Sequence, residues 1–269
     1  MNEEKLFKSI YIDFEIEVKT GLHIGGSAER ADIGGIDKTL VKSPNDGAPY
    51  IPGSSLKGKI RSLLEVVRGE NALGDCKRND ESDVSELFGA ASSDGNEDDN
   101  SIQSRVIFRD AELLYKDELR QKPSELPYLE IKAENTINRI TGKAKNPRKI
   151  ERVIPGAIFQ GNAVIKVIAP DNDNAVEREI QHVLTLLEGF LLLEDDYLGG
   201  SGTRGYGKVK VHLKEVKQRV YRATAEEKHT RFPEKEDYVY PESVKEDSTI
   251  VGFLSEISSS LGKELANPA

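Results

Sequence analysis

The chain has 269 residues, of which 37% are hydrophobic and 32% are charged, and its formal net charge is −9. This composition is too apolar for a wholly disordered chain and too charged for a membrane protein, and the length suffices for one large domain or two small ones. Because no apolar run reaches the length of a membrane span and residues 1–10 lack a signal-peptide core, we expect a cytoplasmic protein with no membrane partner.

Metal-binding chemistry has little support in the residue types. Cys76 is the only cysteine, which excludes an internal disulfide and a cysteine-based zinc site. The histidines at 23, 182, 212 and 229 are scattered without the spacing of metal ligands. We therefore expect no zinc, and the sequence assigns no protein metal ligands.

The distribution of charge matters more than its sum. A negative chain is a poor general partner for nucleic acid, because phosphate contacts dominate such affinity. Residues 75–99, however, hold nine acidic residues against two basic ones, whereas residues 131–153 hold seven basic residues against two acidic ones. We expect surfaces of opposite sign, and the basic one is what a nucleic acid would meet.

A strand, a long loop and a helix open the chain. Apolar residues alternate over residues 9–19, which predicts a strand with one buried face. The glycine-rich loop that follows is long enough to be functional or disordered. The next apolar positions have helical spacing, with Ser54 or Ser55 as a cap and Gly69 as the end: Leu56, Ile60, Leu63, Leu64 and Val67.

The start of this helix is a candidate phosphate site. Lys57, Lys59 and Arg61 lie in its first two turns, off the apolar stripe. A helix N-terminus favours a bound anion, and the glycine loop and the PGSS entry point to the same chemistry. An ordinary solvated basic face is the alternative.

The rest of the chain continues the alternation of strands and helices. We expect a solvated acidic loop with the short apolar piece VSELFG over about residues 71–101, a strand over 104–114, and a projecting basic segment over 127–152 with turns at ITGK and NPRK. A strand over 157–168, a helix over 177–193 and a strand over 208–213 follow. The helix stripe comprises Ile180, Val183, Leu184, Leu187 and Leu191.

The element order predicts an α+β fold with a βαββαβ core of the ferredoxin-like or RRM type. We divide the chain into a core over residues 1–222, with insertions at about 71–101 and 127–155, and a C-terminal extension over 223–269. The aromatic RNP motif of RRM domains is absent from the sequence, so we expect recognition of RNA by backbone and shape.

Several segments resemble one known family. GLHIGG, IGGID, IPGSSLKGKIRSLLE, ENTINRITGKAKNPRKIERV and LGGSGTRGYGKV, in this order over about residues 8–215, are similar to the signature of the RAMP superfamily, specifically the backbone subunit of type III-A CRISPR (Csm) complexes. The resemblance implies that the basic segment is a β-hairpin thumb crossing the guide–target duplex, and that the acidic insertion is a lid.

The resemblance also implies roles for single residues. Asp37 of IGGID aligns with the catalytic aspartate, although a loop aspartate often only bonds to a backbone amide. Asp32 matches no family position. His23 is implied to contact RNA, with a packed loop histidine as the alternative, and Gly200 and Arg204 lie in a glycine-rich turn that allows close approach of RNA or is only a tight turn. Ser54 is assigned to RNA binding, Lys57, Lys59 and Arg61 are assigned to guide-RNA phosphates, and Arg139, Lys143 and Arg148 are assigned to the guide–target duplex.

The implied function is a repeated subunit that binds CRISPR guide RNA and cuts complementary target RNA at regular intervals. The cut is ribose-assisted and needs a divalent cation, Mg or Mn, held in part by RNA oxygens. Further copies of the chain and other Csm subunits are the implied partners. The alternatives are a backbone subunit without activity and, less well supported because the second half does not repeat the first, a guide-processing endonuclease.

Overall fold

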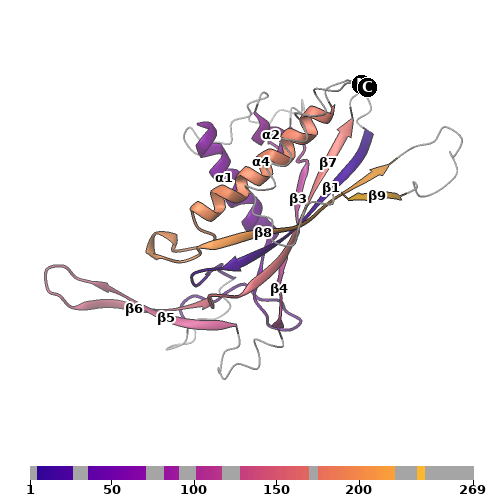
Figure 1. Ribbon diagram of the computed structural model, residues 1–269. Helices are drawn as coiled ribbons and strands as arrows, with labels where there is room; N and C mark the ends of the chain where they lie inside the picture. The colour runs from indigo at the N-terminus through magenta and orange to yellow at the C-terminus, as the bar shows by residue number, and fades with distance from the viewer. Residues whose placement is uncertain are drawn as a thin grey trace, which may run out of the picture.

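The computed structural model describes residues 5–26, 36–70, 82–90, 101–116, 128–169, 175–221 and 235–239. An antiparallel sheet with helices packed against it forms the body, and a two-stranded hairpin projects from one end (Figure 1). The elements are β1 (Lys5–Val18), β2 (Tyr50–Ile51), α1 (Gly53–Arg68), α2 (Asp83–Phe88), β3 (Val106–Phe108), β4 (Ala111–Leu113), β5 (Leu129–Ile137), β6 (Ala144–Val153), β7 (Ile158–Ala169), α4 (Ala175–Asp195), the short 3₁₀ helix η1 (Gly202–Arg204), β8 (Val209–Tyr221) and β9 (Lys235–Val239).

Strand β1 lies at the centre of the large sheet. It pairs antiparallel with β7 on one side and with β8 on the other. β3 and β4 pair with β7, β2 extends the sheet beyond β4, and β9 extends it beyond β8. The fold is therefore a mixed α+β arrangement with antiparallel sheets. No helix of the described segments is both long and apolar enough to cross a membrane.

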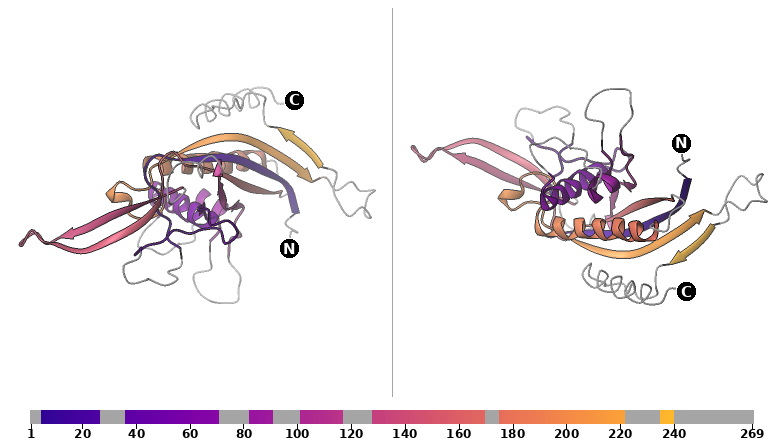
Figure 2. Two further views of the ribbon diagram at one scale, coloured as in Figure 1. Left: turned by 90° about the horizontal axis from the view of Figure 1, so that it is seen from below. Right: turned by 90° about the horizontal axis from the view of Figure 1, so that it is seen from above.

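The alternation predicted for β1 is confirmed. Its inward side chains are fully buried: Ile10, Ile12, Phe14, Ile16 and Val18. They form a core with α1 and α4, which lie together against the sheet (Figure 2). The Phe14 ring lies 4.8 Å from the Phe190 ring of α4. The two helices approach closely because Gly189 leaves space for Ile60, where a Cβ would come within 2.4 Å of the Ile60 side chain.

Two details predicted for the first helix are wrong. Pro52 occupies the N-cap without a side-chain cap among the described residues, and the Gly53 N–H donates to Asp110 Oδ1 at 2.8 Å instead. Val67 is 54% exposed, so the buried stripe comprises only Leu56, Ile60 and Leu64, with Leu63 partly buried. The predicted end at Gly69 is confirmed by its left-handed conformation.

The buried face of α4 is rotated relative to the predicted stripe. Leu186, Phe190 and Leu193 are fully buried with Val183 and Leu187, whereas Ile180, Leu184 and Leu191 are only partly covered. The helix is apolar on much of its circumference, so its sequence alone does not select the face that meets β7, β8 and α1.

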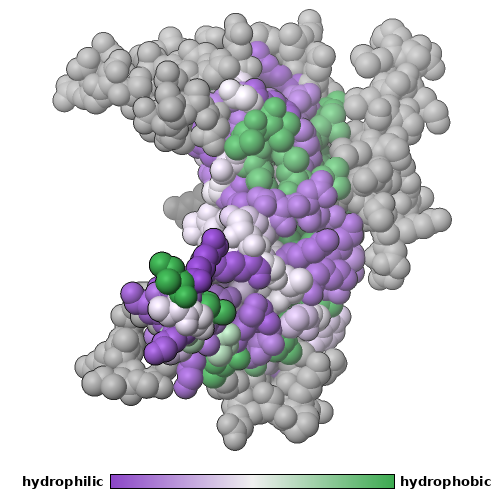
Figure 3. Space-filling model, turned by 90° about the vertical axis from the view of Figure 1, so that its left-hand side faces the viewer, coloured by the Kyte–Doolittle hydropathy of each residue, from purple (hydrophilic) through white to green (hydrophobic). Residues whose placement is uncertain are grey.

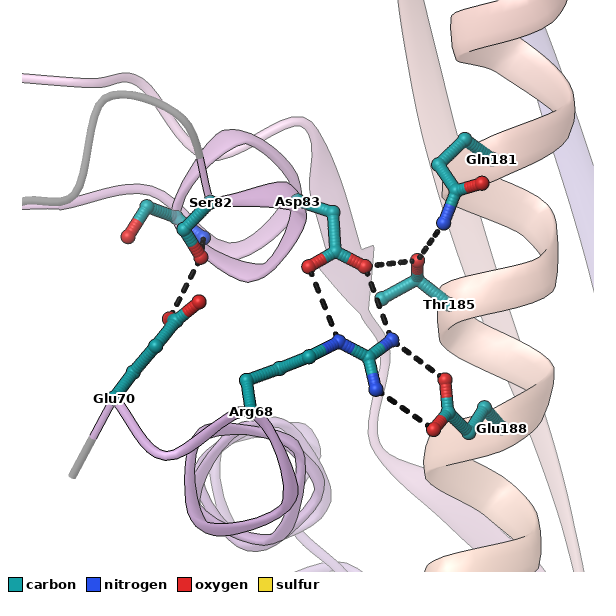
Figure 4. A network of polar contacts seen from close by, with 8 residues as sticks. Arg68, Glu70, Ser82, Asp83, Gln181, Thr185 and Glu188 are labelled. Carbon is teal, nitrogen blue, oxygen red and sulfur yellow. Dashed lines mark hydrogen bonds and ion pairs between the residues drawn. The ribbon is translucent and has the colours of Figure 1, made fainter.

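Arg68 joins three helices at the end of α1. Its guanidinium donates to Glu188 of α4 at 2.8 and 2.6 Å and to Asp83 of α2 at 3.1 Å, and the Thr185 hydroxyl also donates to Asp83 at 2.8 Å (Figure 4). Burial raises the pKa of Asp83, but these bonds outweigh it, and the net pKa lies below its usual range. The pair with Asp83 and Glu188 raises the pKa of Arg68.

The basic segment is a hairpin formed by β5 and β6. The turn predicted at ITGK is confirmed, because the Asn138 N–H donates to the Lys143 carbonyl and Gly142 has a φ of +65°. The turn predicted at NPRK is wrong, since Arg148 lies within β6 opposite Glu134. A β-bulge between Glu134 and Thr136 takes up the irregularity, so the pairing continues past the proline.

Two predicted regions lie largely outside the described residues. Of the acidic segment 71–101 the structure describes 82–90, which include α2, and residue 101. Of the C-terminal extension 223–269 it describes 235–239, the edge strand β9.

Candidate functional site

Asp37 lies at the base of the hairpin. Its backbone N–H donates to the Lys149 carbonyl at 3.0 Å, and its carboxylate Oδ2 accepts the Lys149 N–H at 2.7 Å. The next residue, Lys38, accepts the Glu151 N–H, so this loop continues the small sheet alongside β6. The structure thereby joins the exposed Asp37 to the basic hairpin across 112 residues of sequence.

The alternative role of Asp37, in which a loop aspartate only bonds to a backbone amide, is thus met in part, because its carboxylate does accept such a bond. Oδ2 makes that bond, and Oδ1 has no partner among the described residues. The bond fixes the side-chain direction, while the exposed position leaves Oδ1 open to a ligand or a proton. Asp32 lies outside the described residues.

Glu151 anchors the loop that carries Asp37. It is only 2% exposed, and its carboxylate accepts hydrogen bonds from the Lys42 ammonium at 2.7 Å and from the Leu40 N–H at 3.0 Å. Its own carbonyl lies 2.7 Å from His23 Nδ1. Three hydrogen bonds at one residue of β6 therefore hold both ends of the glycine-rich loop.

His23 is buried, as the packed alternative expected. Its carbonyl accepts the Gly200 N–H at 2.8 Å. A Cβ at the neighbouring Gly199 would come within 2.3 Å of the same carbonyl, so this close approach requires glycine. His23 therefore positions the glycine-rich turn, while Gly200 itself is exposed at its surface.

The glycine-rich turn contacts the hairpin through Tyr206 and Arg204. The buried Tyr206 hydroxyl donates to Glu134 of β5 at 2.7 Å. The Lys132 ammonium and the Arg152 guanidinium make cation–π contacts with the Tyr206 ring, at 4.5 and 4.9 Å from its centroid. Burial and the Glu134 carboxylate raise the pKa of Tyr206 to about 12. Arg204 is 65% exposed and reaches Glu134 at 3.7 Å.

The outer half of the hairpin presents cations and apolar side chains to solvent. Arg139, Lys143 and Arg148 are exposed, with no side-chain partner in the described part of the chain. Ile140 in the turn is 95% exposed, and Ile137 is exposed as well. Figure 3 looks onto the side from which the hairpin projects, and shows hydrophobic atoms at its end among hydrophilic ones. Such a surface suits a polyanion with stacked bases.

The three cations of α1 do not form the single cluster expected from the sequence. Lys57 donates to Ser104 at 2.5 Å, Lys59 to Asp196 at 2.6 Å, and Arg61 pairs with Glu65 at 2.6 Å. Burial, with the nearby charge of Arg61, lowers the pKa of Lys57.

Of the residues predicted to bind RNA near the start of α1, Ser54 and Lys57 share an open cavity of about 330 Å³ beside β3. The Gly53 amide at the same helix end already has the Asp110 carboxylate as its partner.

The sequence did not point to three residues of this region: Glu134, Glu151 and Tyr206. Tyr206 could have been noticed, because it directly follows the glycine-rich turn. The carboxylates carry no local signal, since their partners come from distant segments. Among the described residues, no three His, Cys, Asp or Glu side chains lie together as a metal site.

Comparison with known proteins identifies the family. Residues 15–210 match the model of the RAMP superfamily. A protein of Streptococcus thermophilus named "CRISPR system Cms endoribonuclease Csm3" is 46% identical over 204 residues, which are 76% of this chain and 87% of the relative. The chain belongs to the Csm3 family of the RAMP superfamily.

Other Csm3 proteins extend the likeness over more of the chain. One of the same name from Methanocaldococcus jannaschii is 37% identical over 257 residues, covering 92% of this chain and 91% of the relative. The crystal structure of Methanopyrus kandleri Csm3 covers 96% of this chain and 98% of its own, with a TM-score of 0.63 and 20% identity. The latter supports the mixed α+β fold with antiparallel sheets.

Proposed function

We propose that this Csm3-family chain is a guide-RNA-binding backbone subunit of a type III-A CRISPR complex and an endoribonuclease that cuts complementary target RNA at regular intervals. The observation that carries the proposal is the junction of Asp37 with Lys149, which puts an exposed carboxylate at the base of a basic hairpin. Relatives that carry the name endoribonuclease support the activity.

Within this proposal the fold is an RRM or ferredoxin-like core. The order β1, α1, β3 with β4, β7, α4, β8 reads as βαββαβ, with β1 and β7 adjacent in the middle of the sheet. The hairpin of β5 and β6 is the thumb inserted between the second and third core strands, and the acidic segment is the lid. The hairpin cations Arg139, Lys143 and Arg148 would lie on the guide–target duplex.

The cleavage step follows from an exposed carboxylate beside a splayed target nucleotide. The target 2′-OH attacks the adjacent phosphorus, and the O2′–P bond forms as the P–O5′ bond breaks. A cyclic phosphate remains, and the O5′ oxygen leaves with a proton taken from water. Asp37 Oδ1 accepts the 2′-OH proton, while the Lys149 N–H holds Oδ2. Much of the rate comes from holding the 2′-OH in line with the phosphorus.

A divalent cation, Mg or Mn, belongs to the proposal as a further component that would stabilise charge on the phosphorane. If Asp37 held this ion instead of acting as the base, it would offer one carboxylate ligand, and the described residues contain no group of three His, Cys, Asp or Glu side chains that would make a complete site. RNA oxygens would therefore complete the coordination. The other proposed partners are further copies of the chain and other Csm subunits, and the cytoplasmic location stays a prediction.

The alternative is a backbone subunit without activity, in which Asp37 only secures its loop. The Asp37–Lys149 hydrogen bond is compatible with this structural role as well as with the positioning of a base, so the test must separate the two roles. Asp37→Asn does so, because an amide oxygen still accepts the Lys149 N–H but takes no proton at neutral pH.

The test reconstitutes the complex with guide RNA and a divalent cation and follows labelled target RNA on a sequencing gel. Wild type should cut periodically, and Asp37→Asn and Asp37→Ala should bind target yet cut about 10² to 10⁴ times more slowly. If Asp37→Asn cuts at the wild-type rate while Asp37→Ala fails to assemble, Asp37 is structural. If the wild-type complex binds target without cutting, the inactive backbone is the function.

A further inference from the structure

The Glu134 carboxylate collects donors from two parts of the chain. Tyr206 Oη donates to Oε1 at 2.7 Å, Lys132 Nζ lies 3.8 Å from Oε1, and Arg204 Nη1 lies 3.7 Å from Oε2. Arg148 sits directly across from Glu134 in the hairpin register and therefore on the same face. One hydroxyl donor and two basic side chains thus gather around a single carboxylate, with Arg148 on the same face of the hairpin.

This set of donors is the kind that binds a phosphodiester. Phosphate oxygens in nucleic-acid complexes are bound by arginine, lysine and hydroxyl groups, and charge-assisted bonds of this type are the stronger ones. The carboxylate in the middle is 20% exposed, so solvent and a ligand can reach it. Its charge repels the phosphate that the surrounding cations would attract.

We propose that Glu134 occupies a phosphate subsite of the free chain and that its Oε2 leaves Arg204 when a phosphate of the RNA backbone binds there. The inference rests on the proposed RNA-binding function and adds a self-masking carboxylate to it. The ion pair that must open is weak, because Arg204 is mostly solvent-exposed and such pairs contribute little to stability. The Tyr206 hydroxyl, which is buried, keeps Glu134 in place on the other side.

The consequence is selectivity for RNA that engages many subsites at once. A chain of net charge −9 whose turn arginine is paired internally binds a stray phosphate poorly. A guide RNA that also contacts the outer hairpin supplies enough favourable contacts to displace the carboxylate.

The test measures binding of the full-length chain to a labelled single-stranded RNA of guide length, by anisotropy between 50 and 200 mM salt. Glu134→Gln removes the charge and keeps an acceptor for the Tyr206 hydroxyl. Glu215→Gln is the matched control, since it removes one charge from a carboxylate that pairs with Lys217 on β8. We expect Glu134→Gln to bind about 3- to 10-fold tighter and the control to change affinity less than about twofold.

Repeating the Glu134→Gln measurement in an Arg204→Gln variant tests whether the gain in RNA affinity arises at this subsite. With Arg204→Gln already present, the gain from Glu134→Gln should fall to the level of the control, because the cation that it unmasks is gone. Glu134→Asp keeps the charge but withdraws it by one methylene, so it should give part of the gain in RNA affinity. It replaces Glu134→Gln in the test if that variant is too unstable to measure.

The outcomes separate the inference from the proposed function. If wild type binds RNA and both Glu134 variants match the control, the self-masking carboxylate is refuted while RNA binding stands. If the wild-type chain and its assembled complex bind no RNA, the proposed function itself fails.

Discussion

The ion pair between the buried Glu151 and the partly exposed Lys42 should decide whether the Asp37 loop keeps its place. Glu151→Ala deprives the buried Leu40 N–H of its acceptor, which by itself costs about 1–3 kcal/mol. Removing one partner of a buried pair costs about 3–5 kcal/mol, but Lys42 is 33% exposed and water can reach its ammonium. We therefore expect a loss of about 3 kcal/mol in the free energy of unfolding.

Two companion variants test the physical cause. Glu151→Gln keeps an oxygen for the Leu40 N–H and should cost only about 1–2 kcal/mol. Lys42→Met leaves a carboxylate that is 2% exposed with an amide as its remaining partner, and should cost more than Glu151→Gln. The surface variant Glu215→Ala should stay within about 0.5 kcal/mol.

The measurement is urea unfolding at pH 7 followed by circular dichroism, with the slope compared between variants to confirm a common unfolded state. The reasoning is refuted if Glu151→Ala costs less than about 1 kcal/mol, the weight of an ordinary exposed pair. It is also refuted if Glu151→Gln lowers the free energy of unfolding as much as Glu151→Ala does, since the hydrogen bond from the Leu40 N–H would then contribute nothing to stability.

Two further predictions concern the glycine-rich turn and the helix junction. Gly207→Ala places a Cβ 2.0 Å from the Leu198 carbonyl at a φ of +72° and should lower the free energy of unfolding by at least about 2 kcal/mol. Gly205→Ala has a φ of +82° but open space around the new Cβ, and should lower it by only about 1 kcal/mol. Thermal melts check the difference, and equal shifts in melting temperature would contradict it. Arg68→Met should cost about 1–2 kcal/mol at pH 7. Because Asp83 has a lowered pKa in the fold, its contribution to stability is present above the unfolded pKa near 4 and is lost as the pH falls through the folded pKa. The variant should therefore lose stability less steeply than wild type below about pH 4, as measured by urea unfolding at a series of pH values. An equal dependence of stability on pH in the two proteins would contradict this.

Local patterns in the sequence determined the elements on which the site is built. The alternation of apolar and polar residues predicted the buried face of β1, and the helical spacing of apolar residues with Gly69 at its end predicted α1 and its last residue. The density of lysine and arginine predicted that residues 127–152 project from the body. These features depend on neighbours within a few residues, and for that reason they are legible without a fold.

The tertiary structure decided which side chains meet. Lys57 and Lys59 are two residues apart in sequence, yet one bonds to Ser104 beside β3 and the other to Asp196 after α4, so the predicted cluster does not form. The buried face of α4 likewise depends on what packs against it. A side chain's partner is set by long-range packing, which no periodicity encodes.

The same reason applies to the site itself. The sequence, through its family resemblance, singled out Asp37, but only the fold brings its carboxylate to the Lys149 amide, 112 residues away. Glu134, Glu151 and Tyr206 lie within the family-like segments, but the sequence does not show their roles, because these arise from contacts between the glycine-rich loops and the hairpin. The sequence determined which segments could bind RNA, and the tertiary structure decided how the hairpin and Asp37 are held together.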